Sequence, residues 1–151
     1  CAWGPTAMLP IFQLLGTEYC RKDIITRFIN KEKMYDGFTK ISFIYPHAVA
    51  SMKVGQGAKS EGEMIVSGTK GYIYVPAPWW KPDYFEVRYE NQQNNKRYFY
   101  QLDGEGLRYE LLSFLKAIRT GKEFSYVAND ISKAITSTIA DFYAHQDMTV
   151  I

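Results

Sequence analysis

The spacing of apolar side chains changes along the first third of the chain. Between residues 5 and 15 apolar positions recur every three or four residues, Pro5 suits a first helical turn, and Gly16 follows the last apolar pair. This pattern predicts a helix over residues 5–15. From residue 24 onwards the pattern is that of short strands, which we expect over residues 24–29, 38–45 and 48–54. The predicted helix has an apolar face formed by Met8, Ile11, Phe12 and Leu15.

The clearest local signal is a β-hairpin over residues 63–76. Two apolar runs with an alternating pattern flank the turn Gly68-Thr69-Lys70-Gly71, and glycine can adopt the positive φ values that a tight reversal needs. A second strand pair is expected over residues 84–89 and 97–102, joined by a polar connection. Sequential hairpins of this kind indicate a mostly antiparallel sheet.

The last third of the chain returns to helical spacing. Residues 107–118 predict an amphipathic helix that ends before Gly121, and Asn129 or Asp130 can cap a second helix. We expect both helices to bury their apolar faces against the same side of the sheet, and residues 148–151 to add a short strand. The fold class is therefore α+β, a mostly antiparallel open-faced β-sheet with helices packed on one face. The inward positions of the second helix are Ile131, Ile135, Thr138, Ile139 and Phe142.

The composition of the chain argues against nucleic acid and membranes as partners. The 151 residues fit one domain, and 18 basic and 16 acidic residues are intermixed, so no continuous basic surface points to nucleic acid. No apolar run approaches the ~20 residues that span a bilayer, which predicts a cytoplasmic protein that does not enter membranes. A first residue that is not Met, followed at once by a helical pattern, fits a domain cut from a longer polypeptide.

Motifs for cofactors and metals are incomplete. Gly55-Gln56-Gly57 begins like a dinucleotide-binding fingerprint, but the third glycine and the following helix are missing. The two histidines, His47 and His145, lack metal-ligand spacing, so we expect no metal site. Trp79-Trp80-Lys81 is a candidate for substrate binding, because adjacent tryptophans beside a cation can stack on a sugar or dock a partner. The alternative is that at least one of these rings serves only in packing.

In order and spacing these features resemble the C-terminal domain of the Gfo/Idh/MocA oxidoreductases, the family of glucose-fructose oxidoreductase and inositol dehydrogenase. The similarity covers essentially the whole chain. It rests on Gly4-Pro5 and Leu14-Leu15-Gly16 around the first helix, on the Gly68–Gly71 turn, and on Gly106-Leu107-Arg108-Tyr109-Glu110 at the start of the later helix. Asp36 and the run from Pro76 to Trp80 fall in the family's order.

The resemblance implies a division of labour. Residues 1–151 would form a single substrate-binding and oligomerisation domain of a longer two-domain protein. NAD or NADP would be bound by an N-terminal domain that is absent here, so we expect no cofactor in this chain and no activity from it alone. The implied partners are a small sugar-like substrate and a second copy of the chain, which forms a homodimer through the open sheet face.

The chain also departs from the family pattern. Ala2 stands where the family has an aspartate, and Thr6 where it has the histidine or tyrosine that exchanges a proton with the substrate hydroxyl. Ala2 cannot ionise, and Thr6 cannot serve as an acid near neutral pH. The catalytic candidates are therefore Thr6 by position, and Tyr19 and Lys22 on the next segment. The alternative function is a non-catalytic scaffold or carbohydrate-binding module that has lost the catalytic Asp and His or Tyr.

Overall fold

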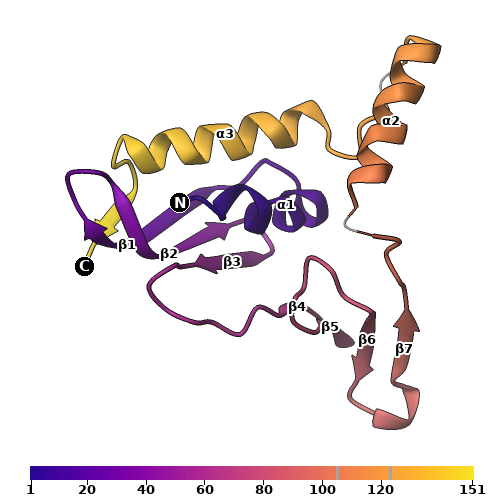
Figure 1. Cartoon of the computed structure of the whole chain (residues 1–151). Helices are drawn as coiled ribbons and strands as arrows, with labels where there is room; N and C mark the ends of the chain where they lie inside the picture. Colours follow the sequence, from indigo (N-terminus) through magenta and orange to yellow (C-terminus); the bar gives the residue numbers. More distant parts are fainter. Residues whose placement is uncertain (105, 123) are drawn as a thin grey trace. The chain divides into compact units, whose positions relative to one another are not determined.

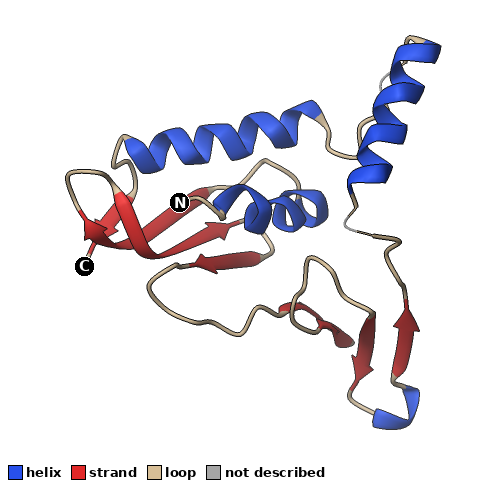
Figure 2. Ribbon diagram, viewed as in Figure 1, coloured by secondary structure: helices blue, strands red, loops and turns tan. Residues whose placement is uncertain are grey.

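The computed structural model describes residues 1–104, 106–122 and 124–151. These residues form two compact units, one comprising Cys1–Ser60 and Tyr126–Ile151, the other Glu61–Ser125. Each unit contains its own four-stranded sheet (Figures 1 and 2). The predicted α+β class with mostly antiparallel strands is confirmed, with the strands divided between two sheets.

The first unit is built on the sheet β3-β2-β1-β8. Strands β1 (Arg21–Asn30), β2 (Tyr35–Ile44) and β3 (Val49–Val54) are consecutive and antiparallel, and β8 (Met148–Val150) runs parallel to β1. Alternate residues of β1 are buried from Lys22 to Phe28, as a sheet with one covered face requires. The predicted strands are thus confirmed, and β1 and β2 extend further toward each other than their apolar runs indicated.

Helices α1 (Gly4–Leu15) and α3 (Asn129–Tyr143) cover one face of this sheet (Figure 1). The aromatic rings of Phe12 on α1 and Phe43 on β2 meet edge to face with centroids 5.0 Å apart, and Phe142 on α3 lies 5.9 Å from Phe28 on β1. Each such side chain contributes roughly 1.5–3 kcal/mol by leaving water. The core is also formed by Met8, Ile24, Ile41 and Met52, with Ile131, Ile135 and Ile139 packed against it.

The second unit contains the sheet β4-β5-β6-β7, a meander of neighbouring antiparallel strands. The predicted hairpin is confirmed, since Gly68 pairs with Gly71 across a two-residue turn. The strand expected over residues 97–102 ends at Phe99. The elements are β4 (Met64–Gly68), β5 (Gly71–Val75), β6 (Tyr84–Tyr89), the 3-10 helix η1 (Gln92–Asn94), β7 (Lys96–Phe99) and helix α2 (Leu107–Thr120).

Two details of the helices correct the sequence-based expectations. None of the described residues of α2 is buried, so the prediction that this helix buries an apolar face against the sheet is wrong. The N-cap of α3 is Ala128, in extended conformation and without a side-chain hydrogen bond, so neither Asn129 nor Asp130 is the cap. Both polar residues instead lie in the first turn, where the negative charge of Asp130 is attracted by the positive end of the helix dipole.

Candidate functional site

The most unusual polar group of the first unit is a lysine that faces the core. Lys22 lies on the helix-covered side of β1, and only 9% of its side chain is exposed. Its Nζ atom contacts the carboxylate of Asp141 on α3 at 2.7 Å and that of Asp147, beyond the end of α3, at 3.2 Å. A buried ammonium requires such partners, because an isolated charge in an apolar interior is strongly disfavoured.

The charge state of Lys22 follows from these contacts. Burial by itself would lower its pKa, but the hydrogen bonds to Asp141 and Asp147 outweigh burial, and the pKa lies above its ordinary value. Lys22 is therefore an ammonium at neutral pH. An acid held this firmly gives up its proton reluctantly, so its chemistry is that of a fixed positive charge.

Tyr19 lies beside this charge. Its ring centroid is 5.9 Å from Lys22 Nζ, and the ring packs against Phe43 at 5.1 Å. Tyr45 follows at 6.4 Å and donates its hydroxyl proton to the carbonyl of Gly16. Burial, together with the neighbouring Tyr19, raises the pKa of Tyr45. Of these two phenols, Tyr19 is the less enclosed, since it is half-buried whereas Tyr45 is buried.

Thr6 and Ala2 are exposed near the start of α1. The helix contains Pro10, which has no N–H and cannot donate to the carbonyl of Thr6 four residues earlier. The carbonyl of Thr6 therefore lacks the donor that residue 10 would supply in an uninterrupted helix. The hydroxyl and this carbonyl are the polar groups that position 6 can present to a ligand.

The tryptophan segment belongs to the second unit. Trp79 and Trp80 lie in the loop between β5 and β6, with ring centroids 6.0 Å apart and planes nearly perpendicular. The Trp79 backbone N–H donates to the carbonyl of Gly62 at 2.9 Å. Trp79 is half-buried, whereas Trp80 is 60% exposed and can stack on a ligand. Lys81 is exposed next to it.

The structure thus brings Tyr19 and Lys22 together in the first unit, which also holds Thr6, and places Trp79, Trp80 and Lys81 in the second. Sequence reasoning missed Asp141 and Asp147. One signal pointed toward them, because a lysine at an inward strand position needs a carboxylate partner. That signal indicates that a carboxylate is needed, but it does not indicate which one, since both aspartates lie far from Lys22 in sequence.

Among the described residues, no group of three or more His, Cys, Asp or Glu side chains could hold a metal ion. In the same part of the chain, every helix is too short or too polar to cross a membrane. No protein-family model matches the sequence, and no curated protein matches it either.

Solved structures do match. KijD10, a 3-ketoreductase from Actinomadura kijaniata in complex with NADP and TDP-benzene, superposes with a TM-score of 0.74 at 10% identity, over 98% of this chain and 46% of its own. Aldose-aldose oxidoreductase from Caulobacter crescentus, complexed with glycerol, superposes with a TM-score of 0.73 at 15% identity, over 93% of this chain and 43% of its own. The YPO2259 protein from Yersinia pestis superposes with a TM-score of 0.67 at 17% identity, over 99% of this chain and 49% of its own.

The fold is that of Gfo/Idh/MocA-type oxidoreductases. This agrees with the resemblance carried by the sequence motifs, and it extends over nearly the whole chain. The chain spans about half the length of the Gfo/Idh/MocA-type structures that it matches. At these identities the similarity establishes the Gfo/Idh/MocA-type fold, and the chemistry has to be argued from the residues.

Proposed function

We propose that this chain is the substrate-binding and dimerisation half of an NAD(P)-dependent oxidoreductase that acts on a sugar or nucleotide sugar. The observation that carries the proposal is the match of 98% of the chain to under half of a 3-ketoreductase whose structure holds NADP and TDP-benzene. Residues 1–151 would serve as one substrate-binding domain of a longer protein. NAD or NADP would be held by the other half of that protein and not by this chain.

Within this function, Tyr19 and Lys22 are the best placed of the candidate residues. Oxidation of a sugar hydroxyl releases a hydride and a proton, and the proton needs an acceptor beside the reacting carbon. Lys22, held cationic by Asp141 and Asp147, supplies a fixed positive charge beside one phenol side chain. That side chain is Tyr19, whose ring centroid lies 5.9 Å from the ammonium nitrogen. Thr6 would contribute hydrogen bonds rather than a transferable proton.

The remaining surfaces have roles in the same proposal. Trp80 offers an exposed ring on which a sugar can stack, with Trp79 and Lys81 beside it. The face of the first sheet that is turned away from α1 and α3 would join two copies of the chain. Its exposed apolar side chains, such as Ile25 and Val49, are the contacts expected of a homodimer.

The deciding experiment begins with the residues encoded upstream. We expect a strand followed by Gly-x-Gly-x-x-Gly and a Glu-Lys-Pro segment, and we expect the full polypeptide to reduce NAD or NADP when given a sugar or nucleotide sugar. Tyr19→Phe should lower kcat by roughly 10²- to 10⁴-fold, whereas Tyr35→Phe, an exposed control, should not. An upstream region without a dinucleotide-binding pattern would overturn the oxidoreductase proposal.

A specific observation favours a second candidate, a non-catalytic carbohydrate-binding scaffold. Ala2 and Thr6 occupy the positions at which the resembled family carries its acid and proton-exchanging residue. The two candidates differ in a direct measurement. A scaffold would bind sugar through Trp80, but its full polypeptide would not reduce the nicotinamide cofactor. The enzyme would bind sugar and reduce the cofactor.

A further inference from the structure

A cluster of charged and aromatic side chains occupies one face of the second sheet. Glu86 on β6 pairs directly with Arg97 on β7, and Arg88 lies two residues along β6 on the same face. Arg88 donates from Nε to Glu86 Oε2 at 2.6 Å. Arg97 donates from Nε and Nη2 to Glu86 Oε1 at 2.8 and 2.5 Å. One carboxylate thereby fixes two guanidinium groups.

Tyrosine rings hold the guanidinium groups from the neighbouring strand positions. Arg88 lies 4.5 Å from the ring centroid of Tyr74 and donates to the Tyr72 hydroxyl at 3.3 Å. Arg97 lies 4.5 Å from the ring centroid of Tyr84. Cation–π contacts of this kind, together with the carboxylate, restrict the rotation of two long side chains before any ligand arrives.

The cluster carries a net positive charge. Two guanidinium groups face one carboxylate, and hydrogen bonds from Arg97 and Arg88 hold the pKa of Glu86 below its ordinary value, so all three groups are charged at neutral pH. The Glu86 side chain is only 13% exposed, whereas Arg97 is 52% exposed. Because Glu86 engages the Nε and Nη2 side of Arg97, the Nη1 side of that guanidinium faces away from the carboxylate.

The exposed tryptophan lies at the same end of this sheet. The loop that carries Trp79 and Trp80 leaves β5 at Val75 and enters β6 at Tyr84, the residue on which Arg97 stacks. Glu86 follows Tyr84 by two residues on β6 and pairs with Tyr74 on β5, so both residues lie near this end of the sheet. A ligand that contains a sugar ring and an anionic group would therefore find a stacking surface in the β5–β6 loop and fixed donors on β6 and β7.

We propose that this face binds a phosphorylated sugar, with the phosphoryl group on Arg97 and Arg88 and the sugar ring on Trp80. A phosphoryl group fits because its several acceptor oxygens can bridge two guanidinium groups, which bind it through paired donors. The sugar part rests on the function proposed above, and the phosphoryl part stands on the geometry of the cluster. Phosphorylated sugars include both simple sugar phosphates and nucleotide sugars, and the choice of probes separates them from free phosphate.

Calorimetric titration of the full chain tests the proposal with four probes: TDP-glucose, glucose 1-phosphate, inorganic phosphate and glucose. We expect saturable binding of at least one of the first two, more tightly than either inorganic phosphate or glucose. Arg97→Gln should weaken that binding by at least about 10-fold, the loss expected for a charge-assisted hydrogen bond. Lys96→Gln removes the same charge from the neighbouring position, which faces the opposite side of β7, and should change the affinity less than about 2-fold.

Two further comparisons keep the test decisive. Arg97→Lys retains the charge but not the paired donors, so it should also weaken binding, and its thermal unfolding reports whether the sheet stays folded. Equal effects of Arg97→Gln and Lys96→Gln, or equal affinity for inorganic phosphate and the sugar phosphates, would overturn the proposal. Glucose that binds as tightly as TDP-glucose would also overturn the phosphoryl assignment, but it would leave the proposed sugar oxidoreductase intact.

Discussion

At the scale of single residues, Gly71 illustrates how one missing side chain permits a close approach between strands. A Cβ atom added at Gly71 would lie 2.3 Å from the carbonyl oxygen of Arg88 on β6. At Gly68, the other glycine of the turn, an added Cβ would lie 3.4 Å from its nearest neighbour, an ordinary contact. The sequence pattern explained both glycines by turn geometry, whereas the structure assigns Gly71 its own role in strand pairing.

We therefore expect Gly71→Ala to destabilise the chain and Gly68→Ala to be nearly neutral. The alanine at position 71 must push β5 and β6 apart, and overpacking of this kind costs about 1–3 kcal/mol. Urea unfolding followed by circular dichroism measures the difference. Similar losses for the two variants would contradict the close approach between β5 and β6.

Removing charges around Lys22 tests the ion pairs in the core of the first unit. Lys22→Met leaves the carboxylate of Asp141 without its cation, and breaking a buried pair in this way typically costs about 3–5 kcal/mol. Asp141 is 20% exposed and Asp147 is 56% exposed, so Asp141→Asn should lower the free energy of unfolding more than Asp147→Asn does. The reverse order in urea unfolding would show that Asp147 is the main partner.

The raised pKa of Lys22 also predicts a pH dependence. The folded state binds the lysine proton more tightly than the unfolded chain does, in which the pKa of Lys22 is near 10.5. The stabilisation is therefore fully present below pH 10.5 and is lost as the pH rises above it, through the folded-state pKa. We expect wild-type unfolding free energy to fall more steeply than that of Lys22→Met in this alkaline range. Parallel slopes for the two proteins would mean that Lys22 does not titrate as proposed.

At the scale of elements, the sequence predicted well where a periodic pattern has a partner. Phe12 on α1 and Phe142 on α3 were expected to face inward and are buried, because the sheet that both helices cover supplies the apolar surface that their spacing requires. The apolar spacing of α2 is as regular, yet Leu107 and Ile118 are exposed. Periodicity states which face of a helix is apolar, and it carries no information about what covers that face.

This contrast predicts unequal effects of core and α2 substitutions. Leu111 on α2 is 55% exposed, so Leu111→Ala should cost about 1 kcal/mol or less. Phe142 on α3 is fully buried, and Phe142→Ala should cost about 3–5 kcal/mol through lost burial and the cavity left behind. Thermal unfolding of the two variants provides the comparison. A large loss in Leu111→Ala would indicate that α2 is covered in solution.

The candidate site was predictable only in part, for a reason that belongs to the whole molecule. Tyr19 and Lys22 are close in sequence, so a local pattern could single out both of them, and the structure places them side by side. Asp141 joins them only because α3 returns across the sheet that contains β1. The cluster of Glu86 and Arg97 likewise depends on the register between β6 and β7. Contacts set by topology and register are not encoded in residue spacing.

The proposed homodimer, finally, depends on the charge of the open sheet face as well as on its apolar residues. On that side of the first sheet, Arg27 and Lys40 lie around Ile25, which is 39% exposed. Two such faces repel one another when they meet across a twofold axis, because each carries mainly positive charge. Salt screens this repulsion, with a Debye length of about 10 Å at 0.1 M. Self-association should therefore become tighter as salt is raised.

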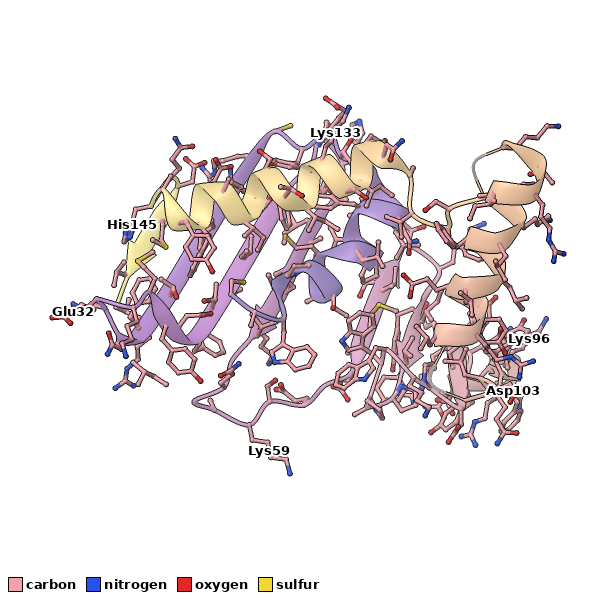
Figure 3. The ribbon with its side chains drawn as sticks, turned by 45° about the horizontal axis from the view of Figure 1, so that its top comes forward. Glu32, Lys59, Lys96, Asp103, Lys133 and His145 are labelled. Atoms are coloured by element: carbon pink, nitrogen blue, oxygen red, sulfur yellow. The ribbon has the colours of Figure 1, made fainter. Side chains whose placement is uncertain are left out.

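Analytical ultracentrifugation at low and moderate salt measures this trend, and one pair of variants locates the interface. Lys40→Glu places an acidic group among the cations of the open face, so it should tighten the dimer most strongly at low salt. Lys133→Glu makes the same change on the solvent side of α3 (Figure 3), away from the open face, and should leave the dimer constant nearly unchanged. A dimer that responds equally to both variants would not be joined through the open sheet face. A protein that stays monomeric at all salt concentrations would remove dimerisation from the proposed function and leave only the substrate-binding role to be tested.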